Sequence, residues 1–137
     1  MAPEPVVSQT RHPLAILVVE DNREARDEIA AELRQRGCRV VVTADGAAGL
    51  EAVVLERFDV VVTDVEMLPR GGLWLWREAT TLRPELRGRF VFSSPQSLAA
   101  SADGPWRAER WLGGRPGAEW LWAEIRAVIE PGAARAS

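Results

Sequence analysis

Four polar side chains stand at the ends of short apolar runs in this sequence. Glu20 and Asp21 follow one such run, Asp64 follows a second, and Ser94 closes a third. Apolar runs of this length, rich in β-branched and aromatic residues, are typical of strands that are buried on both faces. Ligands of open α/β sheets bind beyond the carboxyl ends of the strands. We therefore expect the four side chains to meet at one edge of a sheet.

Three carboxylates in one place favour a bound cation. Glu20, Asp21 and Asp64 would repel one another there, and buried carboxylates need compensation. Carboxylate oxygens in a partly hydrated site suit Mg²⁺, which also binds phosphate oxygens. Any one of these acids, taken alone, is explained equally well as a solvated loop residue. The coincidence of all three at the ends of strands favours a magnesium site.

The alternation of runs along the chain predicts the elements that position these side chains. The expected strands cover residues 14–19, 40–43, 60–63, 90–92 and 110–112. Between them, apolar residues recur at helical spacing. The predicted helical faces consist of Ala25, Ile29 and Leu33, of Leu50, Val53 and Val54, of Leu75, Trp76, Ala79 and Leu82, and of Leu121, Ile125, Val128 and Ile129. Strands that alternate with helices predict a parallel sheet covered on both sides through right-handed crossovers.

Local signals predict where some of these helices begin and end. Asn22 and Asp45 are expected to cap the first two helices, because their short polar side chains can accept bonds from free backbone N–H groups. Gly37 is expected to end the first helix. Residues 95–109 contain two prolines and a glycine, and they predict only a short or distorted helix.

Length and composition bound the possible functions. The chain has 137 residues, a typical size for one domain, and its formal charge of −3 gives no electrostatic footprint for nucleic acid or an anionic membrane. No apolar run approaches the length of a membrane span, and the first residues lack the features of an export signal. The single Cys38 excludes an intramolecular disulfide, which is consistent with a cytoplasmic protein. We expect a flexible leader over residues 1–13, one domain over 14–130 and a flexible tail over 131–137.

The ordered set of motifs resembles the receiver domains of two-component response regulators over residues 14–130. The run Ile16–Asp21 is similar to the first strand of that family with its acidic pair, and the run Val61–Met67 is similar to the strand that carries the phosphoacceptor. Gly72 stands where the family keeps a glycine before its third helix. This resemblance implies a doubly wound, flavodoxin-like (βα)5 three-layer sandwich, whose five parallel strands lie in the order 2-1-3-4-5.

The resemblance also implies a site and its partners. Asp64 would be the phosphoacceptor. Glu20, Asp21, Asp64 and the backbone carbonyl of Glu66 would hold Mg²⁺, and Ser94 would be the switch hydroxyl that senses the phosphoryl group. The phosphoryl donor would be a histidine kinase or a phosphotransfer protein of a phosphorelay.

Three positions depart from the family pattern. Arg115 stands where the family has lysine, and a guanidinium keeps the charge of an ammonium but not its compact geometry. It could pair with the phosphoryl group in two-point fashion, or point away and leave the site without this cation. Leu68 stands where the family usually has proline, with Pro69 displaced by one residue. Leu112 stands where the family often has a switching aromatic residue, so the usual coupling through a rotating ring cannot operate there.

Three functions from different classes are consistent with these observations to different degrees. The first is a phosphoacceptor switch, not an enzyme beyond self-catalysed phosphotransfer and dephosphorylation, that signals to a downstream protein partner. The second is a pseudo-receiver, a protein-interaction module that works without phosphorylation, and the three departures favour it. The third is a flavin or nucleotide binder. It conflicts with Glu20, Asp21 and Asn22, because a phosphate group needs backbone donors after the first strand and these acids would repel an anion.

The chain contains six tryptophans and no tyrosine. Trp76 lies on the apolar face of its predicted helix and is expected in the core. Trp74 and Trp120 are predicted to point away from the apolar faces of their helices, and exposed tryptophans often mark contact surfaces. We expect Trp120 to belong to a homodimer or kinase interface on the last helix, the alternatives being incidental exposure or cover from the C-terminal tail. Cys38 is expected to be a small strand residue without a redox role, and His12 to be solvated.

Overall fold

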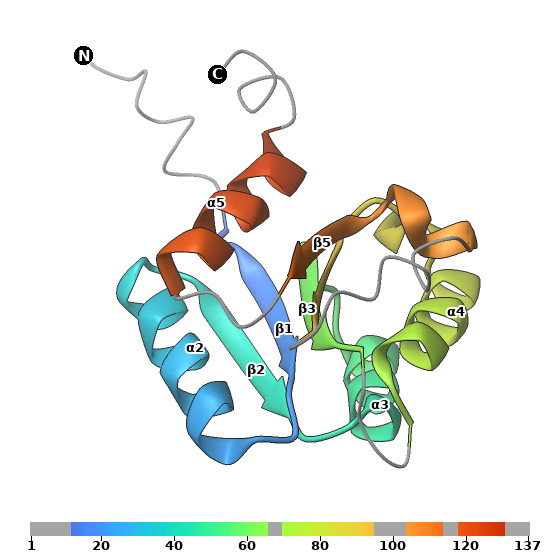
Figure 1. Ribbon diagram of the computed structural model, residues 1–137, viewed down its shortest axis with the longest axis horizontal. Helices are drawn as coiled ribbons and strands as arrows, with labels where there is room; N and C mark the ends of the chain where they lie inside the picture. Colours follow the sequence, from blue (N-terminus) through green and yellow to red (C-terminus); the bar gives the residue numbers. More distant parts are fainter. Residues whose placement is uncertain (1–11, 66–69, 95–103, 114–117, 131–137) are drawn as a thin grey trace.

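A five-stranded parallel sheet forms the centre of the molecule, as the computed structural model shows (Figure 1). Its strands are β1 (Ala15–Val19), β2 (Arg39–Thr43), β3 (Val60–Asp64), β4 (Phe90–Ser94) and β5 (Arg110–Gly113). They lie in the order β2-β1-β3-β4-β5, and every neighbouring pair is parallel. The predicted fold class and strand order are therefore confirmed.

The structure describes residues 12–65, 70–94, 104–113 and 118–130. Most of the predicted leader and all of the predicted tail lie outside the described residues, as do residues 95–103. The division into leader, domain and tail therefore stays a prediction.

Within the described part of the chain, four helices cover the sheet in two layers (Figure 1). They are α2 (Arg23–Gln35), α3 (Gly46–Leu55), α4 (Gly72–Leu82) and α5 (Ala118–Ile129). The helices α2 and α5 lie on one face, and α3 and α4 lie on the other. Two short 3-10 turns, η1 (Pro84–Leu86) and η3 (Pro105–Ala108), complete the described elements, and η3 belongs to the segment for which a short or distorted helix was expected. None of the described helices is long and apolar enough to cross a membrane.

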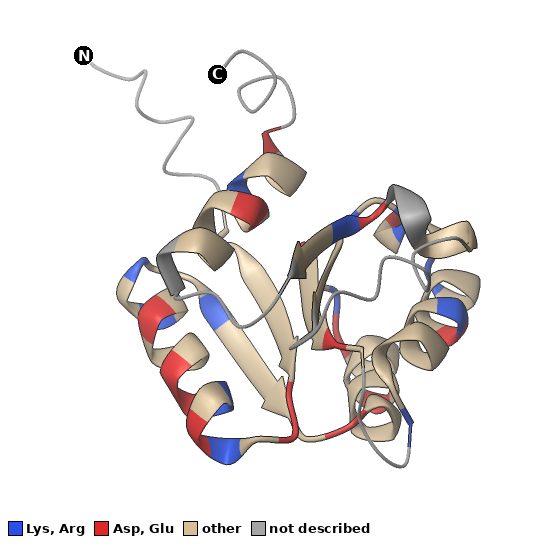
Figure 2. Ribbon diagram, in the orientation of Figure 1, with Lys and Arg blue, Asp and Glu red and all other residues tan. Residues whose placement is uncertain are grey.

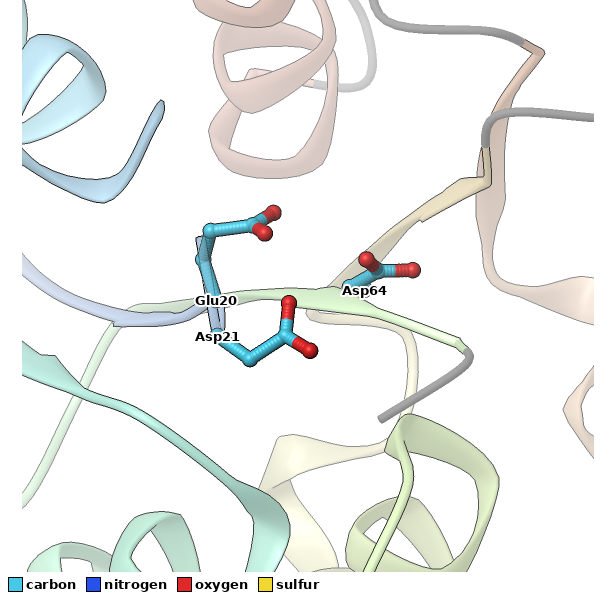
Figure 3. Close-up of side chains that lie close together, drawn as sticks. All are labelled: Glu20, Asp21 and Asp64. Atoms are coloured by element: carbon cyan, nitrogen blue, oxygen red, sulfur yellow. The ribbon is translucent and has the colours of Figure 1, made fainter. Parts of the chain in front are cut away.

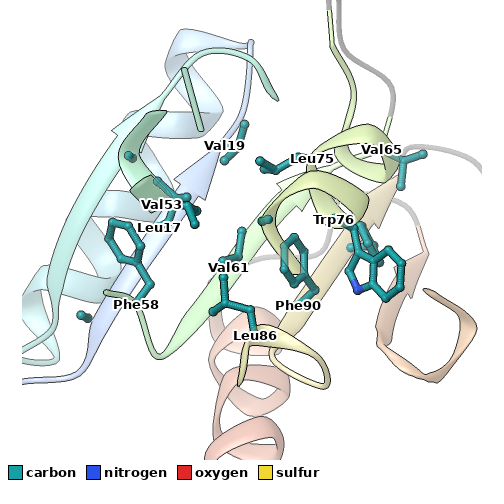
Figure 4. Close-up of a cluster of buried hydrophobic side chains, with 14 residues drawn as sticks. Leu17, Val19, Val53, Phe58, Val61, Val65, Leu75, Trp76, Leu86 and Phe90 are labelled. Atoms are coloured by element: carbon teal, nitrogen blue, oxygen red, sulfur yellow. The ribbon is translucent and has the colours of Figure 1, made fainter. Parts of the chain in front are cut away.

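Each face of the sheet has its own hydrophobic core. In β1, Leu17 and Val19 pack toward α3 and α4, whereas Ile16 and Val18 pack toward α2 and α5. All five residues of this strand are buried, as are all five of β3, which explains why these runs show no alternation of polar and apolar residues. Figure 4 shows the first core, in which Phe90, Leu75 and Trp76 fill the space between the sheet and α4.

The predicted helix caps are present. Asn22 Oδ1 accepts a bond from the Ala25 N–H at 2.8 Å, and Asp45 Oδ1 accepts one from the Ala48 N–H at 2.9 Å. Gly37 follows α2 with a φ of +88°, a conformation that favours glycine and ends the helix.

Two predicted core positions are wrong. Val54 is 54% exposed and Leu82 is 55% exposed. In α3 the buried side is centred on small residues, Gly46, Gly49 and Ala52, because these allow the helix to approach the sheet and α4 closely. In α4 the buried side includes Thr80 in place of Leu82, since the Thr80 hydroxyl is satisfied by the carbonyl of Trp76 at 2.7 Å.

Three of the six tryptophans had a predicted environment, and two of them lie where they were expected. Trp76 is buried and Trp120 is 68% exposed. Trp74 does not point into solvent: it is half-buried against the first core, and the Arg70 guanidinium lies 4.9 Å above its ring. Cys38 is buried but lies just before β2, so its expected place in a strand is wrong, whereas His12 is exposed, as expected.

Candidate functional site

Three carboxylates meet at the carboxyl edge of the sheet (Figure 3). Glu20, Asp21 and Asp64 each offer one oxygen atom, and these atoms lie within 4.8 Å of one another. The side chains of Glu20 and Asp64 are buried, with 4% and 6% of each residue exposed, whereas Asp21 is exposed. The arrangement therefore has a buried base and one open side.

Strand pairing explains this convergence. The strands β1 and β3 are neighbours, and Val19 pairs with Thr63 at the end of the ladder. One further step along both strands brings Glu20 beside Asp64. The Glu20 N–H still donates to the Thr43 carbonyl at 3.1 Å, so the backbone stays aligned with the sheet up to the first acid.

The turn from β1 into α2 holds Glu20 in place. Its carboxylate accepts a bond from the Asn22 N–H at 3.0 Å, and its carbonyl accepts one from Arg26 Nη1 at 3.1 Å. Arg26 is half-buried on the first turns of α2, and it places a positive charge beside the acidic pair. The sequence did not single out Arg26, because a charged residue on a helix is ordinarily a solvated one.

The backbone around Asp64 is held from three sides. The carbonyl of Asp64 accepts a bond from the Thr63 hydroxyl at 3.0 Å. The next residue, Val65, donates to the Ser93 carbonyl at 3.0 Å and accepts from the Gly72 N–H at 3.1 Å. A Cβ on Gly72 would collide with the Asp64 carbonyl, so only glycine fits at this start of α4.

The other predicted site residues are described only in part or not at all. Ser94 is the last residue of β4 and pairs with Gly113, but its side chain is not described. Glu66 and Arg115 lie outside the described residues. Their roles stay predictions.

The aromatic residue of β5 is Trp111, one position before Leu112, which stands where the family often has an aromatic ring. Leu112 is half-buried in the core toward α2 and α5. Its neighbour Trp111 faces the opposite layer, and its ring lies 4.7 Å from that of Phe92 in β4. Within the described part of the chain, the buried indole N–H of Trp111 has no hydrogen-bond partner. In β5, the aromatic residue Trp111 therefore packs against Phe92 on one side of the sheet, while the aliphatic Leu112 faces the other side.

Charges of both signs are interspersed along α2 (Figure 2). The ion pair between Glu32 of this helix and its C-cap residue Arg36, at 2.9 Å, lies at the surface and contributes little stability. All 17 basic residues of the chain are arginines, so no lysine elsewhere can supply the ammonium that the family pattern lacks at Arg115.

Comparison with known families agrees with this architecture. The family model described as the response regulator receiver domain matches residues 16–94, which is more than half of the chain. This chain belongs to that family. Receiver domains are the signalling modules of two-component response regulators, so the resemblance noted in the sequence is confirmed.

Several curated relatives share part of the receiver domain. The transcriptional activator protein PfeR of Pseudomonas aeruginosa is 48% identical over 54 residues, which is 39% of this chain and 17% of PfeR. The response regulator receiver protein CpdR of Brucella abortus is 32% identical over 76 residues, which is 56% of this chain and 63% of CpdR. The CAI-1 autoinducer sensor kinase/phosphatase CqsS of Vibrio cholerae is 40% identical over 76 residues, which is 10% of CqsS. The match therefore spans less than two thirds of the length of each of these relatives.

Solved structures share the fold. The chemotaxis protein CheY4 of Vibrio cholerae superposes with a TM-score of 0.79 at 20% identity, over 85% of this chain and 99% of CheY4. The receiver domain of the sensor histidine kinase PA1611 of Pseudomonas aeruginosa, solved with a magnesium ion in its active-site cleft, superposes with a TM-score of 0.75 at 23% identity, over 86% of this chain and 98% of that domain. Both likenesses concern the fold alone.

Proposed function

We propose that this receiver domain is a phosphoacceptor switch: Asp64 takes a phosphoryl group from a histidine kinase or phosphotransfer protein in a Mg²⁺-dependent reaction. The observation that carries the proposal is the group of three carboxylates, with oxygens within 4.8 Å of one another, at the carboxyl edge of a receiver fold. The output is a contact with a downstream protein. The cytoplasmic location expected from the cysteine usage stays a prediction.

The donor set fits Mg²⁺. The ion takes hard oxygen ligands, keeps several waters, and is commonly held by only one or two carboxylates. Glu20 and Asp64 supply buried oxygens, and exposed Asp21 leaves a side open to water and to a phosphoryl group. The carbonyl of Glu66 would be a further ligand, as the family implies.

The chemistry assigned to Asp64 is nucleophilic. A carboxylate oxygen of Asp64 forms a bond to phosphorus as the phosphorus–nitrogen bond of a phosphorylated imidazole breaks, and the imidazole leaves with a proton from solvent. The product is an acyl phosphate. The chemistry that bound Mg²⁺ supplies is neutralisation of charge on the phosphoryl oxygens. The chain's own contribution is to hold the Asp64 carboxylate in line for attack, which the bonds around Thr63, Val65 and Gly72 support.

Ser94 and Arg115 complete the proposed site. A serine hydroxyl can donate to a phosphoryl oxygen as the threonine of other receivers does. Arg115 keeps the positive charge of the family's lysine, and its planar fork could bind two phosphoryl oxygens at once.

A small phosphoryl donor tests the proposal. Phosphoramidate contains the same phosphorus–nitrogen bond as a phosphorylated imidazole. With Mg²⁺, we expect intact-mass spectrometry to show the gain of one phosphoryl group, and we expect no gain in EDTA or in Asp64→Asn. Asp27→Asn is the matched control, because Asp27 is an exposed carboxylate on α2 outside the cluster. Uptake that survives in Asp64→Asn would overturn the assignment of the acceptor.

The pseudo-receiver is the alternative, and the position of Leu112 favours it. The described part of β5 turns an aliphatic side chain toward α5, where many receivers have a switching ring. A protein that folds but takes up no phosphoryl group in Mg²⁺ would support this alternative and contradict the switch.

Trp120 is the proposed contact of a homodimer through α5. It is the most exposed aromatic residue in the described part of the chain, and a large exposed indole often anchors an interface. We expect light scattering to give the mass of a dimer for the wild type and of a monomer for Trp120→Ala, with Arg126→Ala on the same helix as control. An unchanged mass in Trp120→Ala would contradict the dimer.

A further inference from the structure

The start of α3 touches the segment that follows the phosphoacceptor strand. The N–H of Gly46 donates to the carbonyl of Arg70 at 2.8 Å, although the two residues are 24 positions apart. A Cβ on Gly46 would lie 2.6 Å from that carbonyl oxygen and 3.0 Å from the Arg70 Cβ. The contact is therefore possible only because residue 46 has no side chain.

This contact continues to Asp64 through the backbone. Arg70 is followed by Gly71 and Gly72, and the Gly72 N–H donates to the carbonyl of Val65 at 3.1 Å. Gly72 lies so close to Asp64 that a Cβ there would collide with the Asp64 carbonyl. A displacement of Arg70 is thus passed to the residue that carries the acceptor carboxylate.

We propose that Gly46 is a positioning residue for Asp64: by docking the first turn of α3 on the Arg70 carbonyl, it fixes the segment 70–72 and, through it, the acceptor. This inference rests on the proposed function, because it assumes that Asp64 belongs to a Mg²⁺ site. The sequence analysis did not single out Gly46, since a glycine after a capping residue has no chemistry of its own.

The expected displacement is large enough to matter. With alanine at position 46, the Arg70 carbonyl has to move by about 0.4 Å merely to reach the 3.0 Å limit for real Cβ contacts, and functional groups must be held to within about 0.5 Å. Residues that orient metal ligands from outside typically change metal affinity by about 10–100-fold when substituted. We expect Gly46→Ala to lie at the lower end of this range.

The choice of cation separates positioning from general loss of structure. Mg²⁺ demands near-ideal octahedral geometry, whereas Ca²⁺ accepts irregular arrangements of oxygens. A displaced Asp64 therefore weakens Mg²⁺ binding more than Ca²⁺ binding. A domain that is merely less stable loses both equally.

The test is a titration with Mg²⁺ and then with Ca²⁺, followed by the amide signals of Asp21 and Asp64 in nitrogen-15 NMR spectra. We expect the dissociation constant for Mg²⁺ to rise about 10-fold in Gly46→Ala and that for Ca²⁺ to rise by a smaller factor. Gly37→Ala is the matched control: its φ of +88° makes alanine strained, but a Cβ there meets nothing within 4 Å. We expect it to lower stability and leave both affinities unchanged.

Each outcome has a distinct meaning. If the wild type binds no Mg²⁺, the proposed function fails. If the wild type binds Mg²⁺ and Gly46→Ala binds it equally well, or Gly37→Ala loses as much affinity, the positioning role is overturned.

A measurement on the wild type covers the case in which Gly46→Ala does not fold. Coupling is reciprocal, so Mg²⁺ must strengthen the Gly46 contact if that contact favours Mg²⁺ binding. We expect hydrogen exchange of the Gly46 amide to slow on saturation with Mg²⁺, relative to the Gly37 amide, which donates to Arg34 at 2.9 Å. Exchange that responds equally at both glycines would overturn the proposal.

Discussion

Glu109 is a buried carboxylate whose hydrogen bonds join three parts of the fold. Its substitution tests how much these bonds contribute to stability. The residue is 7% exposed. One carboxylate oxygen accepts bonds from Trp76 Nε1 at 3.0 Å and from the Gly88 N–H at 2.8 Å, and the other accepts one from the Phe90 N–H at 3.0 Å. Glu109 thus ties the start of β5 to α4 and to the start of β4.

The expected cost of Glu109→Ala follows from the donors left behind. The Trp76 and Phe90 donors are buried, and each unsatisfied buried donor costs about 1–3 kcal/mol. Removing the buried charge offsets part of this loss of stability, because keeping a carboxylate out of water is itself costly. We expect the free energy of unfolding to fall by about 3 kcal/mol, a large share of the roughly 5–15 kcal/mol typical of a domain. Glu109→Gln keeps the shape and two of the three bonds, so it should cost about half as much.

Urea unfolding followed by far-ultraviolet circular dichroism measures these costs. Glu85→Ala is the control, because Glu85 is exposed and pairs with Arg57 only at the surface, so the change should stay within about 0.5 kcal/mol. A cost below about 1 kcal/mol for Glu109→Ala would refute the reasoning, since it would mean that the three donors are satisfied without the carboxylate.

Three further predictions concern single residues. In Mg²⁺-free buffer, Asp64→Asn should raise the free energy of unfolding by about 1 kcal/mol, because it relieves repulsion among the three carboxylates. Added Mg²⁺ should stabilise the wild type and remove this difference. A variant that is less stable than the wild type in EDTA would contradict the prediction. Asn22→Ala should cost about 1 kcal/mol in urea unfolding through loss of the α2 cap, and an unchanged midpoint would show that the cap contributes nothing. Burial raises the pKa of the Cys38 thiol, although the positive charge of Arg36 opposes this. The stability that the neutral thiol contributes is present below the ordinary thiol pKa and is lost as pH rises through the raised pKa. The free energy of unfolding should therefore fall less steeply at alkaline pH in Cys38→Ala than in the wild type. An identical decline in both proteins would argue against this.

The fold and the acidic cluster could be predicted because both follow from one-dimensional patterns. The runs that end at Glu20 and at Asp64 are apolar throughout, as strands buried on both faces must be. The rule that ligands bind at the carboxyl ends of parallel strands then brings the two acids to one edge. Neither step needs knowledge of side-chain packing.

The errors concern quantities that depend on packing between elements. Val54 shares a helical face with Leu50 by spacing, but the small residues of α3 turn that helix so that Val54 is exposed. Trp74 was expected in solvent, but Arg70 and the adjoining core cover it. Spacing within one helix contains no information on such neighbours.

The most informative contacts were missed for the same reason. The bonds of Glu109 and the close approach of Gly46 to Arg70 join residues far apart in the sequence. A single glutamate or glycine in a polar stretch gives no signal of such a contact. Both contacts can be recognised only in the three-dimensional structure.

The central claim, that Asp64 lies in a competent phosphoacceptor site, is tested most directly by beryllofluoride, an analogue of the acyl phosphate. We predict a saturable change in tryptophan fluorescence that requires Mg²⁺ and is absent in Asp64→Asn. Trp74 and Trp111 pack against the same core as Val65, the residue after Asp64, so their fluorescence should respond to binding at this site. Calorimetry measures the same binding without relying on fluorescence. Absence of Mg²⁺-dependent binding by both methods would contradict the claim and support the pseudo-receiver, which works without phosphorylation.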